Sequence, residues 1–76
     1  MARREAQFVI CVANRDYAAS LELRKIYQVL NDRAGAKHGQ IRVIDESGED
    51  YLYPEELFVP VHLPQAAERA VRRATA

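Results

Sequence analysis

The sequence predicts a mainly β domain of five short strands followed by a C-terminal α-helix, and three observations predict it. Residues 40–60 contain two runs of apolar and β-branched residues around the sequence DESG at 45–48, which is typical of two strands joined by a tight turn. Residues 7–13 are apolar and β-branched on both faces, as in a buried strand. Pro64 then opens a stretch, 64–74, whose apolar residues fall on one side of a helix.

Length and composition indicate one globular domain. The 76 residues are enough for a single domain with a thin core. Hydrophobic residues make up 49% of the chain and charged residues 29%, and the eleven basic residues balance the eleven acidic ones. The overall charge therefore attracts neither nucleic acid nor an anionic membrane, and binding of either would need a local patch.

Localisation is predicted from the cysteine count and from the longest apolar run. The single cysteine, Cys11, excludes an internal disulfide and fits a reducing compartment. The apolar run at 8–13 is too short for a membrane span, and no small-residue cleavage site follows it. We therefore expect a cytoplasmic protein with no targeting segment and no membrane partner.

Residues 21–30 support two interpretations. Their apolar residues repeat at the spacing of a helix, and they also alternate as in a strand with two covered faces. A lone hairpin is marginal in water, and a stable sheet needs three or more strands. We therefore expect a strand at 25–31. Asp32 then caps a short helix at 33–38 that Gly39 closes.

The turn sequence also predicts the register of the hairpin. Its aspartate and glycine occupy the first and fourth positions of a type I turn, and Gly48 can adopt the left-handed conformation. This arrangement gives a three-residue loop with a bulge. Val43 then faces Tyr51 and Ile41 faces Tyr53, so that both tyrosines share an apolar face and belong to the core.

A two-residue loop would give the opposite arrangement. A slip of one residue exchanges the two faces of a strand. Tyr51 and Tyr53 would then turn outward beside Arg42 and Ile44, and these four residues would form a surface of the kind enriched in protein interfaces. They are the candidate partner-binding residues of the chain.

The last part of the chain is predicted to contain a turn, a strand and a helix. Pro54 ends a strand and starts a short turn at 54–57. Pro60, within a strand at 58–62, indicates an edge strand or a bulge. The helix at 64–74 has a mostly alanine apolar side, so it buries little and docks weakly.

The order of these elements resembles the SH3-like small barrel, with a long first loop, a hairpin between the third and fourth strands and a one-turn connection before the fifth. At the residue level the chain is similar to a group of small bacterial proteins usually called hypothetical. The similar residues are Ser20 and Leu21, residues 25–30, Asp32, residues 41–54, Phe58, and Leu63 with Pro64. The resemblance covers about residues 8–64. It implies one domain over residues 1–76, a five-stranded barrel over about 7–62 and a helix over about 64–74, and it carries no activity to this chain.

Proline-peptide-binding SH3 domains differ from this chain in two features. Their acidic first loop and their paired tryptophans are missing, and the sequence contains no tryptophan. The difference argues against polyproline recognition even within an SH3-like barrel.

No residue pattern predicts catalysis, a metal site or a cofactor. Cys11 with His38 or His62 is conceivable as a thiol nucleophile with a base, but a cysteine inside an apolar strand is more often a small buried hydrophobic residue. The acidic residues of the hairpin lack the spacing of a calcium loop and are typical of a solvated turn. We therefore predict no enzyme, no metal and no cofactor.

Two functions remain as hypotheses. The leading one is a non-enzymatic interaction domain that binds a protein partner or itself, because the hairpin carries two of the four tyrosines. The alternative is a nucleic-acid-binding small barrel whose local basic patch consists of Arg24, Lys25, Arg33 and Lys37. The neutral net charge favours the interaction domain.

Overall fold

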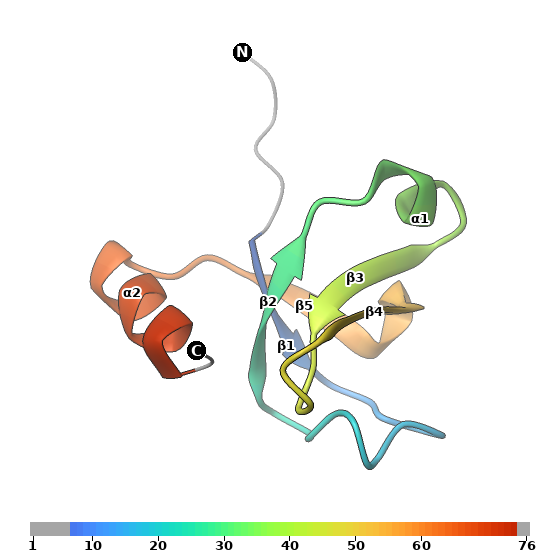
Figure 1. Cartoon of the computed structure of the whole chain (residues 1–76), viewed down its shortest axis with the longest axis horizontal. Helices are drawn as coiled ribbons and strands as arrows, with labels where there is room; N and C mark the ends of the chain where they lie inside the picture. The colour runs from blue at the N-terminus through green and yellow to red at the C-terminus, as the bar shows by residue number, and fades with distance from the viewer. Residues whose placement is uncertain (1–6, 75–76) are drawn as a thin grey trace.

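The computed structural model describes residues 7–74 and shows a mainly β fold with a C-terminal helix (Figure 1). The elements are β1 (Phe8–Cys11), β2 (Ile26–Leu30), α1 (Arg33–Lys37), β3 (Gln40–Ile44), β4 (Asp50–Pro54), the 3₁₀ turn η1 (Glu55–Leu57), β5 (Phe58–Val61) and α2 (Gln65–Ala74). The five strands form one antiparallel sheet in the order β4-β3-β2-β1-β5. The predicted domain limits at residues 1 and 76 lie outside the described residues.

The central strand β2 changes partner along its length. Ile26 and Gln28 pair with β1, whereas Val29 and Leu30 pair with β3. The predicted strand at 25–31 is therefore confirmed. At the two ends of the sheet, β4 and β5 do not pair with each other within residues 7–74. The sheet is open there, so the closed barrel implied by the resemblance is not observed.

The turn between β3 and β4 has the predicted conformation. The amide of Gly48 donates to the carbonyl of Asp45 at 3.0 Å, and the amide of Asp45 donates to the carbonyl of Glu49 at 3.0 Å. Gly48 has a φ of 85°, in the left-handed region. The three-residue loop is therefore confirmed.

The register that follows from this loop is confirmed as well. Ile41 faces Tyr53 and Val43 faces Tyr51. The two tyrosines point to the same side of the sheet, but Tyr53 is 4% exposed and Tyr51 is 49% exposed. The expectation that both belong to the core is right for Tyr53 and wrong for Tyr51, because β4 is an edge strand and the covering rings reach only the Tyr53 end.

The core lies on one face of the sheet, which we call the inner face. Leu21 of the loop between β1 and β2 and Leu57 of η1 pack against the strands there. It is small, as expected for a chain of this length. Its buried members are Val9, Cys11, Leu21, Tyr27, Val43, Tyr53, Leu57 and Phe58. The hydrophobic effect of this cluster acts on side chains from all five strands at once, so it holds the strands to one another.

The short helix α1 has the predicted ends. Asp32 is the N-cap, and its Oδ1 accepts from the amide of Gly35 at 2.8 Å. Gly39, with a φ of 71°, follows the helix and turns the chain back into β3.

The helix α2 lies beside β2 and covers one end of the outer face of the sheet (Figure 1). It covers Phe8, which is 1% exposed, and the guanidinium of Arg72 lies 5.1 Å from the centre of the Phe8 ring. None of the residues of α2 is fully buried, which agrees with its mostly alanine apolar side. Within residues 7–74, no helix is long and apolar enough to cross a membrane.

We expect Gly48→Ala to lower the free energy of unfolding by about 1 kcal/mol, because a residue with a Cβ is disfavoured in the left-handed conformation. An added Cβ at this position meets no atom within 4 Å, so the loss comes from the backbone conformation alone. Denaturant unfolding measures the change. Gly48→Asn is the control, since asparagine tolerates a positive φ better than alanine does. Equal stability of wild type and Gly48→Ala would contradict the conformation of this turn.

Candidate functional site

A pocket of about 420 Å³ lies between the β3–β4 hairpin and the loop that joins β1 to β2, residues 12–25. We call it the tyrosine pocket. Its lining residues are Tyr17, Ser20, Asp45, Ser47, Tyr51, Leu52 and Tyr53. Its volume is in the range of small ligand sites, and three of its lining side chains are aromatic.

The loop side of the pocket is held by hydrogen bonds within the loop. The amides of Ser20 and Leu21 both donate to the carbonyl of Tyr17 at 2.9 Å, and the side-chain amide of Asn14 donates to the carbonyl of Leu21 at 2.9 Å. Leu21 is fully buried and anchors the loop in the core. The backbone that carries Tyr17 and Ser20 is therefore ordered by the fold itself.

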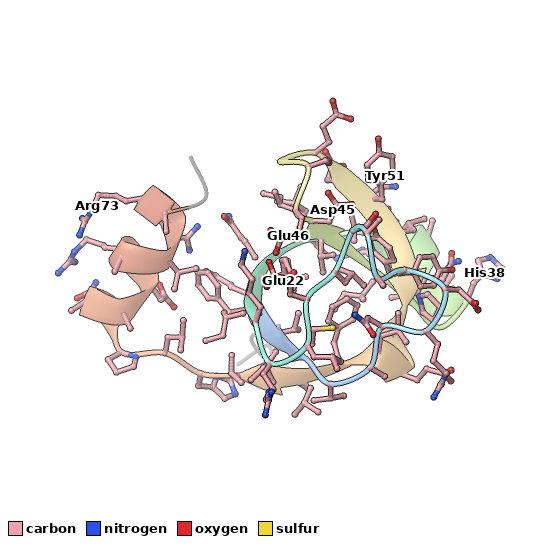
Figure 2. The ribbon with its side chains drawn as sticks, turned by 90° about the horizontal axis from the view of Figure 1, so that it is seen from below. Glu22, His38, Asp45, Glu46, Tyr51 and Arg73 are labelled. Carbon is pink, nitrogen blue, oxygen red and sulfur yellow. The ribbon has the colours of Figure 1, made fainter. Side chains whose placement is uncertain are left out.

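The hairpin side is attached to the same loop through Glu46. Its amide donates to the carbonyl of Ser20 at 3.0 Å, and its carboxylate accepts from the hydroxyl of Tyr27 at 2.5 Å and pairs with Lys25 at 2.6 Å. The Tyr27 hydroxyl also accepts from the amide of Glu22 at 2.7 Å. Figure 2 shows Glu22 and Glu46 together, between the loop and the hairpin. The two sides of the pocket thus form one connected unit.

The aromatic rings of the pocket differ in burial. Tyr53 forms the floor, and its ring lies 5.0 Å from that of Tyr17 at an interplanar angle of 86° and 6.3 Å from that of Phe58. Such edge-to-face pairs are favourable beyond the area that they bury. Tyr51 stands at the rim, where its hydroxyl donates to Glu49 at 2.8 Å (Figure 2). The pocket therefore has a rigid floor and one exposed aromatic ring.

Asp45 lies at the wall of the pocket, and the residue is only 6% exposed. One oxygen accepts from the amide of Ser47 at 2.9 Å and from its hydroxyl at 2.6 Å, and the other accepts from the hydroxyl of Tyr53 at 2.5 Å. Burial acts to raise the pKa of Asp45, but these hydrogen bonds outweigh it and place the pKa below its usual value. Asp45 is therefore ionised at neutral pH.

The tyrosines that bond to these carboxylates keep their protons. Burial, together with the hydrogen bond to Asp45, raises the pKa of Tyr53 to about 12. Burial also raises the pKa of Tyr27, and the hydrogen bond to Glu46 adds to the increase. Both hydroxyls are therefore donors, and neither is a base at neutral pH.

The structure does not bring the four predicted partner-binding residues together. Arg42 and Ile44 lie on the face of the hairpin opposite to Tyr51 and Tyr53, because the register is that of the three-residue loop. The guanidinium of Arg42 is held by Asp32 at 2.8 Å and by Asp50 at 3.0 Å. Tyr53 lies in the core. Of the four, only Tyr51 combines a large exposed side chain with a place in the pocket.

The four predicted nucleic-acid residues do not form one surface. Arg24 and Lys25 precede β2, whereas Arg33 and Lys37 belong to α1 at its other end, a distance on the order of 15 Å. Lys25 is paired with Glu46, so part of its charge is neutralised. Arg33 and Lys37 line a second pocket, of about 400 Å³, which also contains acidic residues.

The thiol of Cys11 is inaccessible. Cys11 has no exposed surface, its thiol donates to the carbonyl of Ala13 at 3.2 Å, and burial raises the pKa of the thiol. The interpretation of Cys11 as a buried hydrophobic residue is confirmed. His38 and His62 are exposed, and His38 points away from the sheet (Figure 2). Within residues 7–74, no three histidine, cysteine or acidic side chains are grouped so as to hold a metal ion.

Sequence reasoning missed Tyr17, Ser20 and Asp45 as members of one site. The segment that carries Tyr17 and Ser20 is polar and predicts only a turn, and Asp45 is explained by its position in the hairpin turn. The proximity of loop and hairpin depends on contacts between segments that are distant in the sequence, such as that between Glu46 and Ser20. No local pattern in the sequence predicts such a contact.

Comparison with known proteins identifies no relative: no protein-family model, curated protein or solved structure matches this chain.

We expect Tyr53→Phe to lower the free energy of unfolding at neutral pH by about 1–2 kcal/mol, because the buried Asp45 carboxylate loses a donor. The pKa of Asp45 is depressed in the folded state, so its contribution to stability is present above its unfolded pKa and is lost as the pH falls through the folded value. The difference between the variant and wild type is therefore largest at neutral pH and shrinks in acid.

Denaturant unfolding over a series of pH values measures this effect. Tyr51→Phe is the matched control, since it removes only an exposed hydroxyl that bonds to Glu49, and its stability is expected to equal that of wild type. A Tyr53→Phe protein as stable as wild type at neutral pH would show that the bond to Asp45 contributes nothing.

Proposed function

We propose that this chain is a non-enzymatic interaction domain that binds a segment of a protein partner in the tyrosine pocket. The observation that supports the proposal most is the combination of Tyr51, an exposed ring at the rim, with the buried ring of Tyr53 beneath it. Tyrosine is enriched in protein interfaces because a large apolar ring and a polar hydroxyl contact the partner together.

The arrangement of the elements supports an SH3-like fold for this domain. The long loop after β1, the β3–β4 hairpin and the 3₁₀ turn η1 before β5 follow one another as in SH3-like small barrels, and β5 pairs with β1. In this proposal the chain is a small barrel of this class whose edge strands β4 and β5 do not pair within residues 7–74.

The order of the pocket also supports binding. Hydrogen bonds fix its loop side at Tyr17 and its hairpin side at Glu46, so a ligand need not order either side on arrival. Preorganisation of this kind lowers the entropic cost of association. The carboxylate of Asp45 already accepts hydrogen bonds from Ser47 and Tyr53, an arrangement that fixes it in place and does not offer it as a base.

The proposal is tested by a selection experiment, in which a displayed library of random peptides is passed over the immobilised protein. We expect selected peptides to bind, and Tyr51→Ala to weaken their binding about tenfold, since truncation of an aromatic residue that contacts the partner costs on the order of 1–2 kcal/mol. Val59→Ala is the matched control, because Val59 is also about half exposed, at 47%, but lies on β5 outside the pocket. Its affinity is expected to equal that of wild type.

Three outcomes would count against the proposal. A library that yields no binding peptide, or peptides that bind Tyr51→Ala as well as wild type, would remove the pocket as the interface. In the third outcome, the protein instead binds single-stranded nucleic acid in a salt-sensitive way and loses this binding when Arg33 and Lys37 are substituted. That result would support the nucleic-acid alternative.

Sedimentation of the free protein separates a partner-binding domain from one that binds itself.

A further inference from the structure

The charge of Asp45 is not neutralised by any basic side chain within residues 7–74. Two other acids of the same hairpin are paired with cations: Glu46 pairs with Lys25 at 2.6 Å, and Asp50 pairs with Arg42 at 3.0 Å. Asp45 is nine-tenths buried, and its hydrogen bonds come only from neutral donors. Asp45 lines two cavities, the tyrosine pocket and a smaller one that also contains Lys25, whose ammonium group is engaged by Glu46. An ionised carboxylate without a cation attracts a positive charge, and on the side of the tyrosine pocket no basic residue among the described lining residues supplies one.

The aromatic rings of the same pocket favour the same kind of ligand. Tyr17 and Tyr53 stand perpendicular to each other at 5.0 Å and form a corner, and Tyr51 lies at the rim beside its hydrogen-bonded neighbour Glu49. The faces of aromatic rings attract cations through their quadrupole, most strongly where water is excluded. No basic residue is among the described residues that line the pocket, so the site has no cation of its own.

The hydrogen bonds of Asp45 distinguish between the two possible cationic side chains. A carboxylate offers about four acceptor positions, and here three of them are used, two by Ser47 and one by Tyr53. A guanidinium group binds a carboxylate best through two parallel hydrogen bonds, for which Asp45 lacks free positions. An ammonium group is a compact charge that needs only one of them, and its charge is also attracted by the aromatic rings that line the pocket.

We propose that the tyrosine pocket selects a lysine side chain of the partner segment, and this inference rests on the proposed function. The ammonium group of the lysine is recognised by the Asp45 carboxylate and by the rings of Tyr17 and Tyr51. The second pocket offers a contrast. It is lined by the basic residues Arg33, Lys37 and Arg42 and by the acidic residues Asp32 and Glu55, so it already contains cations of the chain itself.

The first experiment uses the peptides selected on the wild-type protein. We expect lysine to be enriched at one position, and replacement of that lysine by norleucine, a neutral residue of similar length, to weaken binding about tenfold. Replacement by arginine is expected to weaken it by several-fold, because Asp45 has a single acceptor position left. Higher salt is expected to reduce the difference between lysine and norleucine, since salt screens the partly exposed charges.

A second experiment titrates small probes into the isotope-labelled protein and follows the NMR signals. The probes are Nα-acetyl-lysine N-methylamide, which keeps its side-chain ammonium group, and the norleucine analogue. The lysine probe is expected to shift the amide signals of Ser20, Ser47 and Tyr51 and to saturate at a concentration about tenfold lower than the norleucine probe. Tyr51→Leu, which keeps apolar area but removes the ring, is expected to lower the affinity for the lysine probe several-fold and to leave the norleucine probe unchanged. Val59→Ala is expected to leave both unchanged.

Asp45→Asn completes the set, because it keeps the shape of the side chain and removes its charge. A folded Asp45→Asn protein is expected to lose most of the preference for the lysine form of the selected peptide over the norleucine form and to keep only the smaller part that the aromatic rings supply. If the variant does not fold, Tyr51→Leu and the salt series on wild type decide the question in its place.

The results separate failure of this inference from failure of the proposed function. If the selected peptides depend on Tyr51 but bind equally with lysine or norleucine, the inference is overturned and the interaction domain stands. If arginine binds as tightly as lysine, the acceptor positions of Asp45 do not discriminate between the two cations, and the selection of lysine is overturned. If no peptide binds at the pocket, the proposed function fails and the inference fails with it.

Discussion

The rest of the structure depends on two adjacent carboxylates at the start of the β3–β4 turn. Asp45 bonds to the hydroxyl of Tyr53 in its own hairpin, while Glu46 bonds to the hydroxyl of Tyr27 on β2 and to the backbone of the β1–β2 loop through Ser20. One turn thereby ties the hairpin to the central strand and to the longest loop. In a chain with so small a core, hydrogen bonds to buried tyrosines contribute a large share of what defines a single arrangement.

The same interactions create the pocket and determine its charge. Since the floor ring of Tyr53 must keep its hydroxyl hydrogen-bonded, a carboxylate lies beside it, and that carboxylate remains ionised because Ser47 and Tyr53 stabilise its charge. The cations that contact other acids of the hairpin are engaged there, Lys25 of the β1–β2 loop with Glu46 and Arg42 with Asp50. A structural requirement of the core thus leaves a negative, aromatic opening at the surface.

Much of the fold was predictable because its signals are local. The turn chemistry at Gly48 identifies both the hairpin and its register, Asp32 caps α1, and Pro60 marks β5 as an edge strand. The site was less predictable. The register places Tyr51 and Tyr53 on the same face, but their burial depends on what covers that face, and the covering ring of Tyr17 comes from a loop whose sequence predicts only a turn.

The sequence by itself therefore determined the number and order of the strands, the hairpin register and the burial of Cys11, since turn geometry and apolar patterning act over a few residues. Tertiary structure alone decided that the sheet remains open between β4 and β5, that Tyr51 is exposed while Tyr53 is not, and that Asp45 meets the aromatic rings of the pocket. These features depend on contacts between segments far apart in the chain, and their outcome is set by packing and charge compensation in three dimensions.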